Sequence, residues 1–451
     1  MATPSRVRPN VPREQFAFEY RPETDQSFEN ALAKARSGER LSVADGVELL
    51  VTGTDREGID LERKELVLEA ADRRRAEVVG DEVTFVANLN NNITTACNTG
   101  CLFCNFKDRS DQFLEDNNDD HGGFTKTPEE SRRIVAEAVD RGIYEVTSVS
   151  GLHPAFALDD DHRELLEASD RGDLNYKSPD RYEVDPGTYV EQMRAMSVDD
   201  LHVHSMTPEE GYHARRGTDW SYEEVYGRLA EAGLDSVPGT AAEILVDEVR
   251  DVICPGKIDT GEWVQAIEAA ANVGLPTTAT VMYGHVENER HRVEHLDVIR
   301  RLQDRTDNIT EFVPLSFIHP DTPLHDRGMV ETGANVHEDE LMIAVSRLYL
   351  DNIEHIQSSW VKYGDEQGLK MLSCGADDFM GTILSEEITK RAGGDYGEAR
   401  SVAEYVEMIS AVGRVPVERS TDYTERRRVD PEETPHGPEL GPHADGTPLV
   451  E

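Results

Sequence analysis

From about residue 80 onward, short apolar runs alternate with amphipathic stretches. Eight runs rich in apolar or β-branched residues have the length of buried strands, and helical patterns such as PEESRRIVAEAVDRG lie between them. The predicted strands are residues 82–90, 143–150, 201–205, 234–239, 277–284, 309–317, 353–360 and 369–375. Eight strands that alternate with helices predict an α/β fold, the (β/α)8 TIM-type barrel.

The pattern also divides the chain into regions. Residues 1–25 are polar and rich in proline, which predicts a disordered arm. Residues 26–80 carry helical patterns, with Ser42 as the N-cap of one helix, and predict an N-terminal helical extension. The barrel is expected over residues 81–420. Residues 421–451 lack a core pattern and predict a disordered acidic tail.

The charge of the chain is strongly negative. Its 451 residues include 46 Lys and Arg against 90 Asp and Glu, a formal charge of −44, and only nine of the basic residues are lysines. This balance argues against binding nucleic acid or anionic membranes, which both need a positive surface. A dense acidic coat is typical of a halophilic protein, because in molar salt the Debye length falls to about 3 Å and self-repulsion is screened. With no apolar secretory signal at the start, we expect a cytoplasmic protein.

Three of the five cysteines lie within eight residues. Cys97, Cys101 and Cys104 follow the first predicted strand, at the barrel end where catalytic loops lie. Cysteine thiolates bind zinc and iron–sulfur clusters, and structural zinc normally takes four protein ligands. No fourth Cys or His lies nearby, since Cys254 and Cys374 are distant. A 4Fe–4S cluster held by three thiolates instead leaves one iron open for another ligand.

The Cys-x3-Cys-x2-Cys spacing, with Phe103 before the last cysteine, resembles the signature of the radical S-adenosylmethionine (SAM) superfamily. The resemblance implies that Cys97, Cys101 and Cys104 hold a 4Fe–4S cluster, that SAM binds the open iron, and that Phe103 lies at the cofactor. In this superfamily an electron from the cluster cleaves SAM to a 5′-deoxyadenosyl radical, so the cofactor supplies the difficult chemistry.

Six further segments carry a closer resemblance, over roughly residues 40–425. In order they are HVHSMTPEE, PGTAAEIL, TTATVMYGHVE, ITEFVPLSFI, QSSWVKYG and CGADDFMGT. Together they resemble the tyrosine-dependent subunit of deazaflavin (FO) synthase, the CofH family. The menaquinone-pathway relatives, aminofutalosine synthase and cyclic dehypoxanthine futalosine synthase, resemble the same span but tend to carry extra glycines at PGTAAEIL, and they remain the alternative within the superfamily.

The CofH resemblance implies a specific reaction. The 4-hydroxybenzyl group of L-tyrosine would move to 5-amino-6-(D-ribitylamino)uracil after the tyrosine Cα–Cβ bond breaks, leaving an imine of glyoxylate. Because the chain has one three-cysteine motif, it would be one half of a pair. The resemblance therefore implies a second, CofG-like subunit as functional partner, and an electron donor.

Other site residues follow the predicted strands. By resemblance, Ser150 and Gly151 would receive the methionine end of SAM, although the family more often has two glycines there. Glu243 would contact the ribose or amino group of the cofactor, or would otherwise be an acid at a helix start. An ordinary turn at Ser150 and Gly151 is the competing interpretation.

Histidine and tyrosine side chains at strand ends are the catalytic candidates. His204, Tyr283 and His285 are expected near the substrates, because a histidine can donate or accept a proton near neutral pH. His153 occupies a similar position. For these residues, as for His202 on the same strand face as His204, the alternative is a hydrogen-bonded core side chain, and for His202 we favour that alternative.

Two functions of another class stay open. HRVEH, from His291 to His295, fits an inverted zinc-peptidase pattern, in which two histidines share a helix face and bind zinc. A zinc-binding protein or hydrolase is therefore a remote alternative. A catalytically inactive scaffold is the other.

Overall fold

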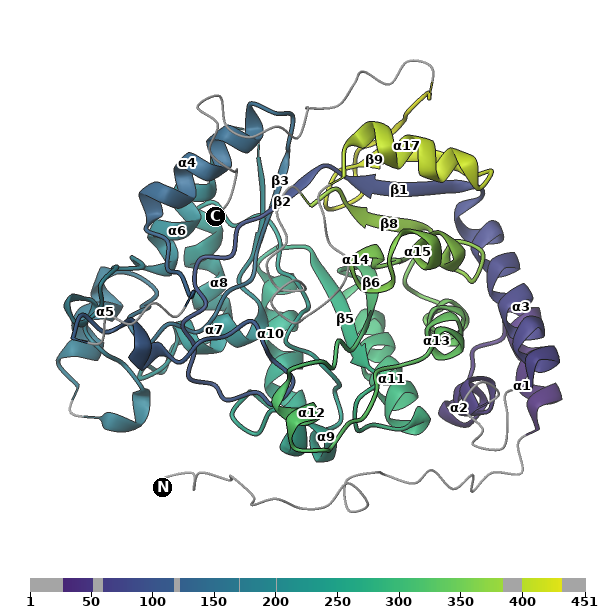
Figure 1. Ribbon diagram of the computed structural model, residues 1–451, viewed down its shortest axis with the longest axis horizontal. Helices are drawn as coiled ribbons and strands as arrows, with labels where there is room; N and C mark the ends of the chain where they lie inside the picture. The colour runs from purple at the N-terminus through teal and green to yellow at the C-terminus, as the bar shows by residue number, and fades with distance from the viewer. Residues whose placement is uncertain are drawn as a thin grey trace.

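The computed structural model describes residues 27–51, 60–116, 122–169, 171–199, 201–383 and 400–431, and Figure 1 shows their arrangement. Its strands are β1 (Glu82–Val86), β2 (Asn88–Asn90), β3 (Glu145–Ser148), β4 (His202–Ser205), β5 (Thr277–Tyr283), β6 (Ile309–Ser316), β7 (His355–Ile356), β8 (Asp378–Gly381), β9 (Val415–Arg419) and β10 (Arg426–Arg428).

Helices separate these strands along the chain. The α-helices are α1 (Phe28–Ser37), α2 (Val43–Val51), α3 (Leu61–Val79), α4 (Pro128–Val139), α5 (Asp160–Glu167), α6 (Tyr189–Met196), α7 (Pro208–Ala214), α8 (Tyr222–Glu231), α9 (Asp247–Ile253), α10 (Thr260–Asn272), α11 (Glu289–Thr306), α12 (Pro323–Asp326), α13 (Val336–Tyr349), α14 (Trp360–Tyr363), α15 (Asp365–Met371) and α17 (Val402–Ala411). Among the described ranges, none has both the length and the apolar character needed to cross a membrane.

The strands form the predicted parallel ring. β8 and β1 pair, β2 pairs with β3 and β3 with β4, and β5, β6 and β7 form a third parallel group. Single bridges join the groups: His204 to Ser236, Val237 to Thr277, and Gln357 to Asp378. Because β1 and β2 are consecutive in the chain, the ring closes into a TIM-type barrel with the helices outside (Figure 1).

One predicted strand is wrong and another is minimal. Residues 369–375 belong to the end of α15 and the turn after it, and the eighth strand is β8, three residues later. The run LKMLSCG is apolar because α15 and the turn after it bury Met371, Leu372 and Cys374, and periodicity over seven residues cannot distinguish such a helix end from a strand. The fourth strand, predicted at 234–239, is reduced to the bridges made by Ser236 and Val237.

The N-terminal helices pack on one flank of the barrel. α3 contacts α13, and α2 contacts α11 and α13, at the right of Figure 1. Ser42 caps α2 as predicted, since its Oγ accepts a hydrogen bond from the Asp45 backbone N–H at 3.2 Å. Lys34 and the buried Asp45 form an ion pair at 2.9 Å that joins α1 to α2. The predicted arm over residues 1–25 lies outside the described residues.

The chain end re-enters the sheet. β9 pairs in parallel with β1 on the side away from β8, and β10 pairs antiparallel with β9. The prediction of a disordered tail from residue 421 is therefore wrong for residues 421–431. The prediction failed because β10 consists of three exposed arginines (RRR), which give no apolar strand pattern. Residues 432–451 lie outside the described part.

Candidate active site

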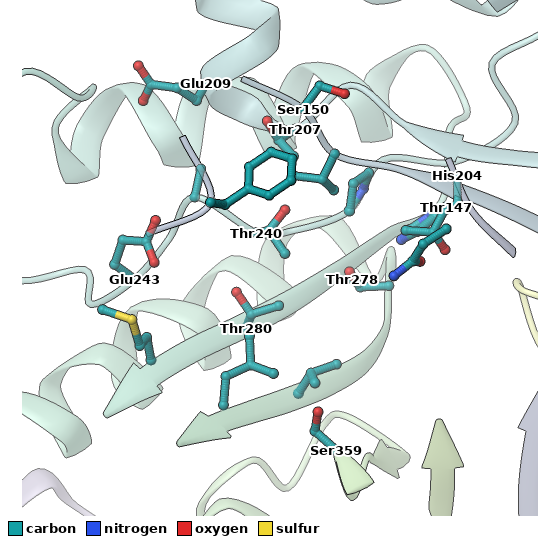
Figure 2. A pocket seen from close by; sticks show the side chains of 18 of the residues that line it. Thr147, Ser150, His204, Thr207, Glu209, Thr240, Glu243, Thr278, Thr280 and Ser359 are labelled. Atoms are coloured by element: carbon teal, nitrogen blue, oxygen red, sulfur yellow. The ribbon is translucent and has the colours of Figure 1, made fainter. Parts of the chain in front are cut away.

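A cavity of about 380 Å³ lies inside the barrel. Eight of the ten predicted site residues line it: Cys97, Cys101, Phe103, Cys104, Ser150, Gly151, His204 and Glu243. Figure 2 shows Glu243 and Glu209 at one end of the view, with Thr147 and His204 at the other. The cavity thus joins the cysteine loop to the middle of the barrel.

Backbone hydrogen bonds hold the cysteine loop in place. The Cys97 N–H donates to the Asp108 carbonyl at 3.0 Å, and the Leu102 N–H donates to the Ile253 carbonyl at 2.8 Å. The Lys107 ammonium donates to the Cys101 carbonyl at 2.9 Å. The loop therefore rests on α9 and on the residues around Asp108 that follow it, with its thiols at the cavity wall.

Three thiols on one cavity fit an iron–sulfur cluster. Burial raises the pKa of Cys101 and of Cys104, so without metal these thiols are neutral, and a metal is what would hold them as thiolates. Cys97 Sγ instead contacts Thr99 Oγ1 at 3.2 Å. Within the described ranges, no three Cys, His, Asp or Glu side chains are grouped closely enough to hold a single metal ion.

Small residues let the neighbouring backbone approach this loop. A Cβ on Gly151 would lie 2.6 Å from the Ala96 carbonyl oxygen, and one on Gly256 would lie 2.5 Å from that of Thr99. The Gly151 N–H donates to the Thr94 carbonyl at 2.8 Å. Gly151 thus ties the end of β3 to the strand end from which the cysteines emerge.

Glu210, at the start of α7, supports the same turn. Its carboxylate accepts hydrogen bonds from the Thr207 N–H and hydroxyl, at 2.9 and 2.7 Å, and from the Ser150 N–H at 3.3 Å. Burial raises the pKa of Glu210 to about 7, against the lowering effect of these hydrogen bonds. Ser150 Oγ accepts from the Ile93 N–H at 2.6 Å, so both its backbone and its side chain are fixed.

A buried ion pair lies beside the cysteines. Lys257 Nζ is 2.7 Å from Glu243 Oε1, and both side chains are largely buried. Burial alone would lower the pKa of Lys257, but Glu243, with Cys101 and Glu209 nearby, holds it above its usual value. Glu243 also adopts a left-handed φ of 47°, a strained conformation of the kind that gathers at functional sites.

Buried polar side chains line the inner part of the cavity. Glu145 on β3, Glu311 on β6 and Arg419 on β9 border it together with His204. Burial lowers the pKa of His204 to about 4, so its imidazole is neutral. His204 Nδ1 shares a hydrogen bond of 2.6 Å with Ser236 Oγ, and His202 Nε2 binds the same hydroxyl at 2.7 Å.

Tyr283 and His285 do not line the cavity. The Tyr283 hydroxyl donates to Asp339 Oδ1 at 2.7 Å and lies 2.9 Å from the Tyr363 hydroxyl, behind β5. His285 forms a contact of 2.9 Å with the buried Glu287. His153 is also buried outside the cavity, and its ring packs against that of Tyr182 at a tilt of 59°.

The two histidines of HRVEH, which could share a zinc ion, bind different groups instead. His291 Nε2 lies 3.0 Å from Glu248, and His295 Nδ1 accepts a hydrogen bond from the Leu245 N–H at 2.9 Å. The two imidazoles therefore have separate partners, both on the segment that precedes α10.

Sequence reasoning missed eight charged residues of the cavity wall: Lys107, Glu145, Glu209, Glu210, Lys257, Glu311, Lys362 and Arg419. A signal existed for Glu145 and Glu311, because a lone acid inside an apolar strand must have a partner if it faces the core. Arg419 had no such signal, since it lies where the pattern of apolar residues fades.

Two family models match the chain. That of the radical SAM superfamily covers residues 91–299, which include the cysteine loop. That of the CofH/MqnC C-terminal region covers residues 307–432, which include β9 and β10.

Similar proteins with curated names cover nearly the whole chain. One from Haloarcula marismortui is 76% identical over 434 residues, 96% of each chain, and one from Halobacterium salinarum is 70% identical over 433 residues, 96% of this chain and 95% of its own. One from Methanocaldococcus jannaschii is 39% identical over 374 residues, 82% of this chain and 95% of its own. All three carry the name 5-amino-6-(D-ribitylamino)uracil–L-tyrosine 4-hydroxyphenyl transferase.

Solved structures show the same fold at low identity. Methylornithine synthase aligns with a TM-score of 0.58 at 18% identity, over 86% of this chain and 97% of its own. HydG, a maturase of the [FeFe]-hydrogenase, aligns with a TM-score of 0.60 at 13% identity, over 90% of this chain and 78% of its own. The predicted barrel is thereby confirmed.

Proposed function

Because the chain belongs to the family of 5-amino-6-(D-ribitylamino)uracil–L-tyrosine 4-hydroxyphenyl transferases, we propose that the barrel cavity is where this reaction takes place. The enzyme is a radical SAM transferase of deazaflavin (FO) biosynthesis, which cleaves the Cα–Cβ bond of L-tyrosine and adds the 4-hydroxybenzyl group to the aminouracil. The names of the two halophilic relatives favour this reaction over those of the menaquinone pathway.

The cofactors of the enzyme are a 4Fe–4S cluster and SAM. Cys97, Cys101 and Cys104 would hold the cluster, because their thiols lie on one cavity wall and no other Cys borders it in the described ranges. When bound, the two cofactors supply one-electron chemistry. Phe103, Ser150, Gly151 and Glu243 line the same end and would position SAM.

The cavity wall protects reactive species. Val86, Val149, Val313 and Leu315 supply apolar surface to the wall of the cavity. Substrates bound inside this cavity would be shielded from water, which keeps radicals from side reactions.

Among the three catalytic candidates, His204 is the one in position to touch substrate. It lines the cavity and is neutral near pH 7, so it can accept or donate a hydrogen bond without carrying charge. Tyr283 and His285 would act as structural residues of β5 and the loop after it, because their polar atoms bind Asp339 and Glu287 outside the cavity.

The enzyme would work with a second, CofG-like subunit and with an electron donor. Its product still needs ring closure, and the chain has one three-cysteine motif for one radical reaction. The charge of −44 suits a cytoplasm with molar salt, where an acidic coat remains folded.

The three thiols on one cavity wall carry this proposal, and anaerobic reconstitution tests it. The wild type should bind four irons per chain and release 5′-deoxyadenosine when SAM, tyrosine and a reductant are present. Cys97→Ala should lose both properties, whereas Cys374→Ala, which removes a thiol buried far from the loop, should keep both. Stoichiometric zinc in the wild type, or an active Cys97→Ala variant, would contradict the proposal.

A further inference from the structure

The inner part of the cavity is polar, although the barrel around it is apolar. Glu145 begins β3 and Ser150 follows its end, so roughly 16 Å of extended strand separates this part from the SAM end. Glu145, Glu311 and Arg419 are each less than 10% exposed. Burying charged side chains costs free energy even when they are paired, so three of them in one barrel indicate a functional role.

Most of these groups already hold one another in place. Arg419 Nε donates to Asp378 Oδ2 at 2.7 Å, and its Nη2 donates to Glu311 Oε2 at 3.1 Å. Glu145 accepts hydrogen bonds from Asn88 Nδ2 at 3.0 Å and from Thr147 Oγ1 at 3.1 Å. The network therefore forms a rigid floor whose internal bonds do not depend on a ligand.

Glu311 is bonded on one oxygen only. Its Oε2 accepts three hydrogen bonds, from Arg419, from Gln357 Nε2 at 3.1 Å and from the Tyr423 hydroxyl at 2.6 Å. In the described part of the chain, Oε1 receives none. Since Glu311 lines the cavity, this oxygen is an acceptor available to a ligand.

Two more polar atoms at the same wall, one on Gln357 and one on His204, also lack a hydrogen-bond partner among the described residues. Gln357 uses its Nε2 on Glu311, and the described residues give its Oε1 no donor. His204 uses Nδ1 on Ser236, and its Nε2 has no partner among those residues. The inner end thus presents two acceptors and one imidazole nitrogen, from Glu311 on β6, Gln357 after β7 and His204 on β4.

This set fits a ligand that offers several N–H and O–H donors. The aminouracil has ring N–H groups, an exocyclic amine and a polyhydroxyl chain, all of which need acceptors. Tyrosine must place its amine and its Cα–Cβ bond beside SAM, where the radical forms, so it could offer this wall only its phenol hydroxyl. Most of the wall would then stay unpaired, which costs free energy in a buried site.

The geometry points to the inner end of the cavity, at Glu311, Gln357 and His204, as the subsite that binds the aminouracil. This inference rests on the proposed function and adds to it the location of the acceptor substrate. Tyrosine then lies between this subsite and SAM, so the 4-hydroxybenzyl group is released next to the ring that takes it. Arg419, Asp378 and Tyr423 are positioning residues, since they hold Glu311 in its orientation.

Glu311→Gln tests the subsite by replacing one hydrogen-bond acceptor that faces the ligand with a donor. The new amide should turn its oxygen toward Arg419, Gln357 and Tyr423, because all three donate there. Its NH2 group then replaces the acceptor that faces the ligand. The matched control is Glu418→Gln, which makes the same substitution on the outer face of β9, where Glu418 pairs with the exposed Arg427.

The experiment is an anaerobic titration of cluster-loaded, SAM-bound protein with aminouracil and, separately, with tyrosine. We expect Glu311→Gln to raise the Kd for aminouracil by about tenfold or more while the Kd for tyrosine stays within about twofold. Gln357→Met should show the same direction and provides a second, independent variant. Glu418→Gln should match the wild type for both ligands.

The outcomes separate the two proposals. An aminouracil Kd in Glu311→Gln and Gln357→Met equal to that of the wild type overturns the subsite, and so does a rise confined to tyrosine. If the wild type itself binds SAM but neither substrate, the proposed function fails before the variants are compared.

Discussion

Replacing Arg419 by Met should destabilise the barrel by removing the one cation of a buried network. The guanidinium is 3% exposed and contacts the carboxylates of Asp378, itself fully buried, and Glu311. Met has a similar length and no charge, so the substitution keeps the volume and leaves the two acids without their cation. Removing one partner of a buried ion pair typically costs about 3–5 kcal/mol.

The remaining contacts of Asp378 decide where in this range the loss of stability in Arg419→Met should fall. Its carboxylate still accepts hydrogen bonds from Thr84 Oγ1 and from the Met380 N–H, both at 2.7 Å, while the Tyr423 hydroxyl, which donates its one proton to Glu311, lies 3.0 Å away. Hydrogen bonds to a charged group each stabilise it by about 1.5–3 kcal/mol, so we expect a loss near the lower limit, about 3 kcal/mol.

A double-mutant cycle measures this interaction. Urea unfolding of the cluster-loaded protein gives the free energy of unfolding for the wild type, Arg419→Met, Asp378→Asn and the double variant. We expect the double variant to recover at least half of the loss, because the substituted asparagine side chain has no charge to leave unpaired. A loss below about 1 kcal/mol for Arg419→Met, or equal costs of Asp378→Asn in both backgrounds, would refute the reasoning.

Three further predictions concern single side chains. Burial raises the pKa of Glu311 to about 7 from its usual 4.5, so the stability that its neutral form provides at acid pH is lost as the pH rises through 7. The free energy of unfolding of Glu311→Gln, followed by thermal melts, should therefore gain on that of the wild type by up to about 3 kcal/mol between pH 5 and pH 8. A difference that stays constant over this range would contradict the prediction. Tyr283→Phe should lower the urea-measured stability by about 1–2 kcal/mol through its lost contacts to Asp339 and Tyr363, with kcat unchanged, whereas a tenfold fall in kcat would restore the catalytic role. Gly151→Ala should weaken SAM binding, measured by titration, on the order of tenfold, because its Cβ would press on the Ala96 carbonyl; wild-type affinity would show that this turn does not position SAM.

The repeating pattern of strands and helices was enough to predict the barrel. Buried parallel strands read as continuous apolar runs, and seven of the eight runs correspond to strands or bridges of the ring. The exception, residues 369–375, was lost because a short buried helix and a short buried strand have the same apolar composition.

The cysteine loop was predictable from local spacing, whereas the inner wall of the cavity was not. Three ligands within eight residues leave a signal that needs no knowledge of the fold. Glu311 and Arg419 meet only because β9 joins the sheet beside β1, a pairing between segments more than 300 residues apart. The placement of Tyr283 failed for a related reason: alternation along β5 does not say which face points into the barrel, and Tyr283 faces α13 and Asp339.

The identity of the transferred group tests the central claim most directly. Cluster-loaded protein would be incubated anaerobically, in high salt, with SAM, a reductant, aminouracil and tyrosine labelled with 13C in its ring, and the products would be measured by mass spectrometry. The account predicts one adduct that carries all of the ring label, with a mass equal to the aminouracil plus the 4-hydroxybenzyl group minus the one hydrogen that the group replaces. Release of 5′-deoxyadenosine with no labelled adduct, or turnover only with futalosine-pathway substrates, would contradict it.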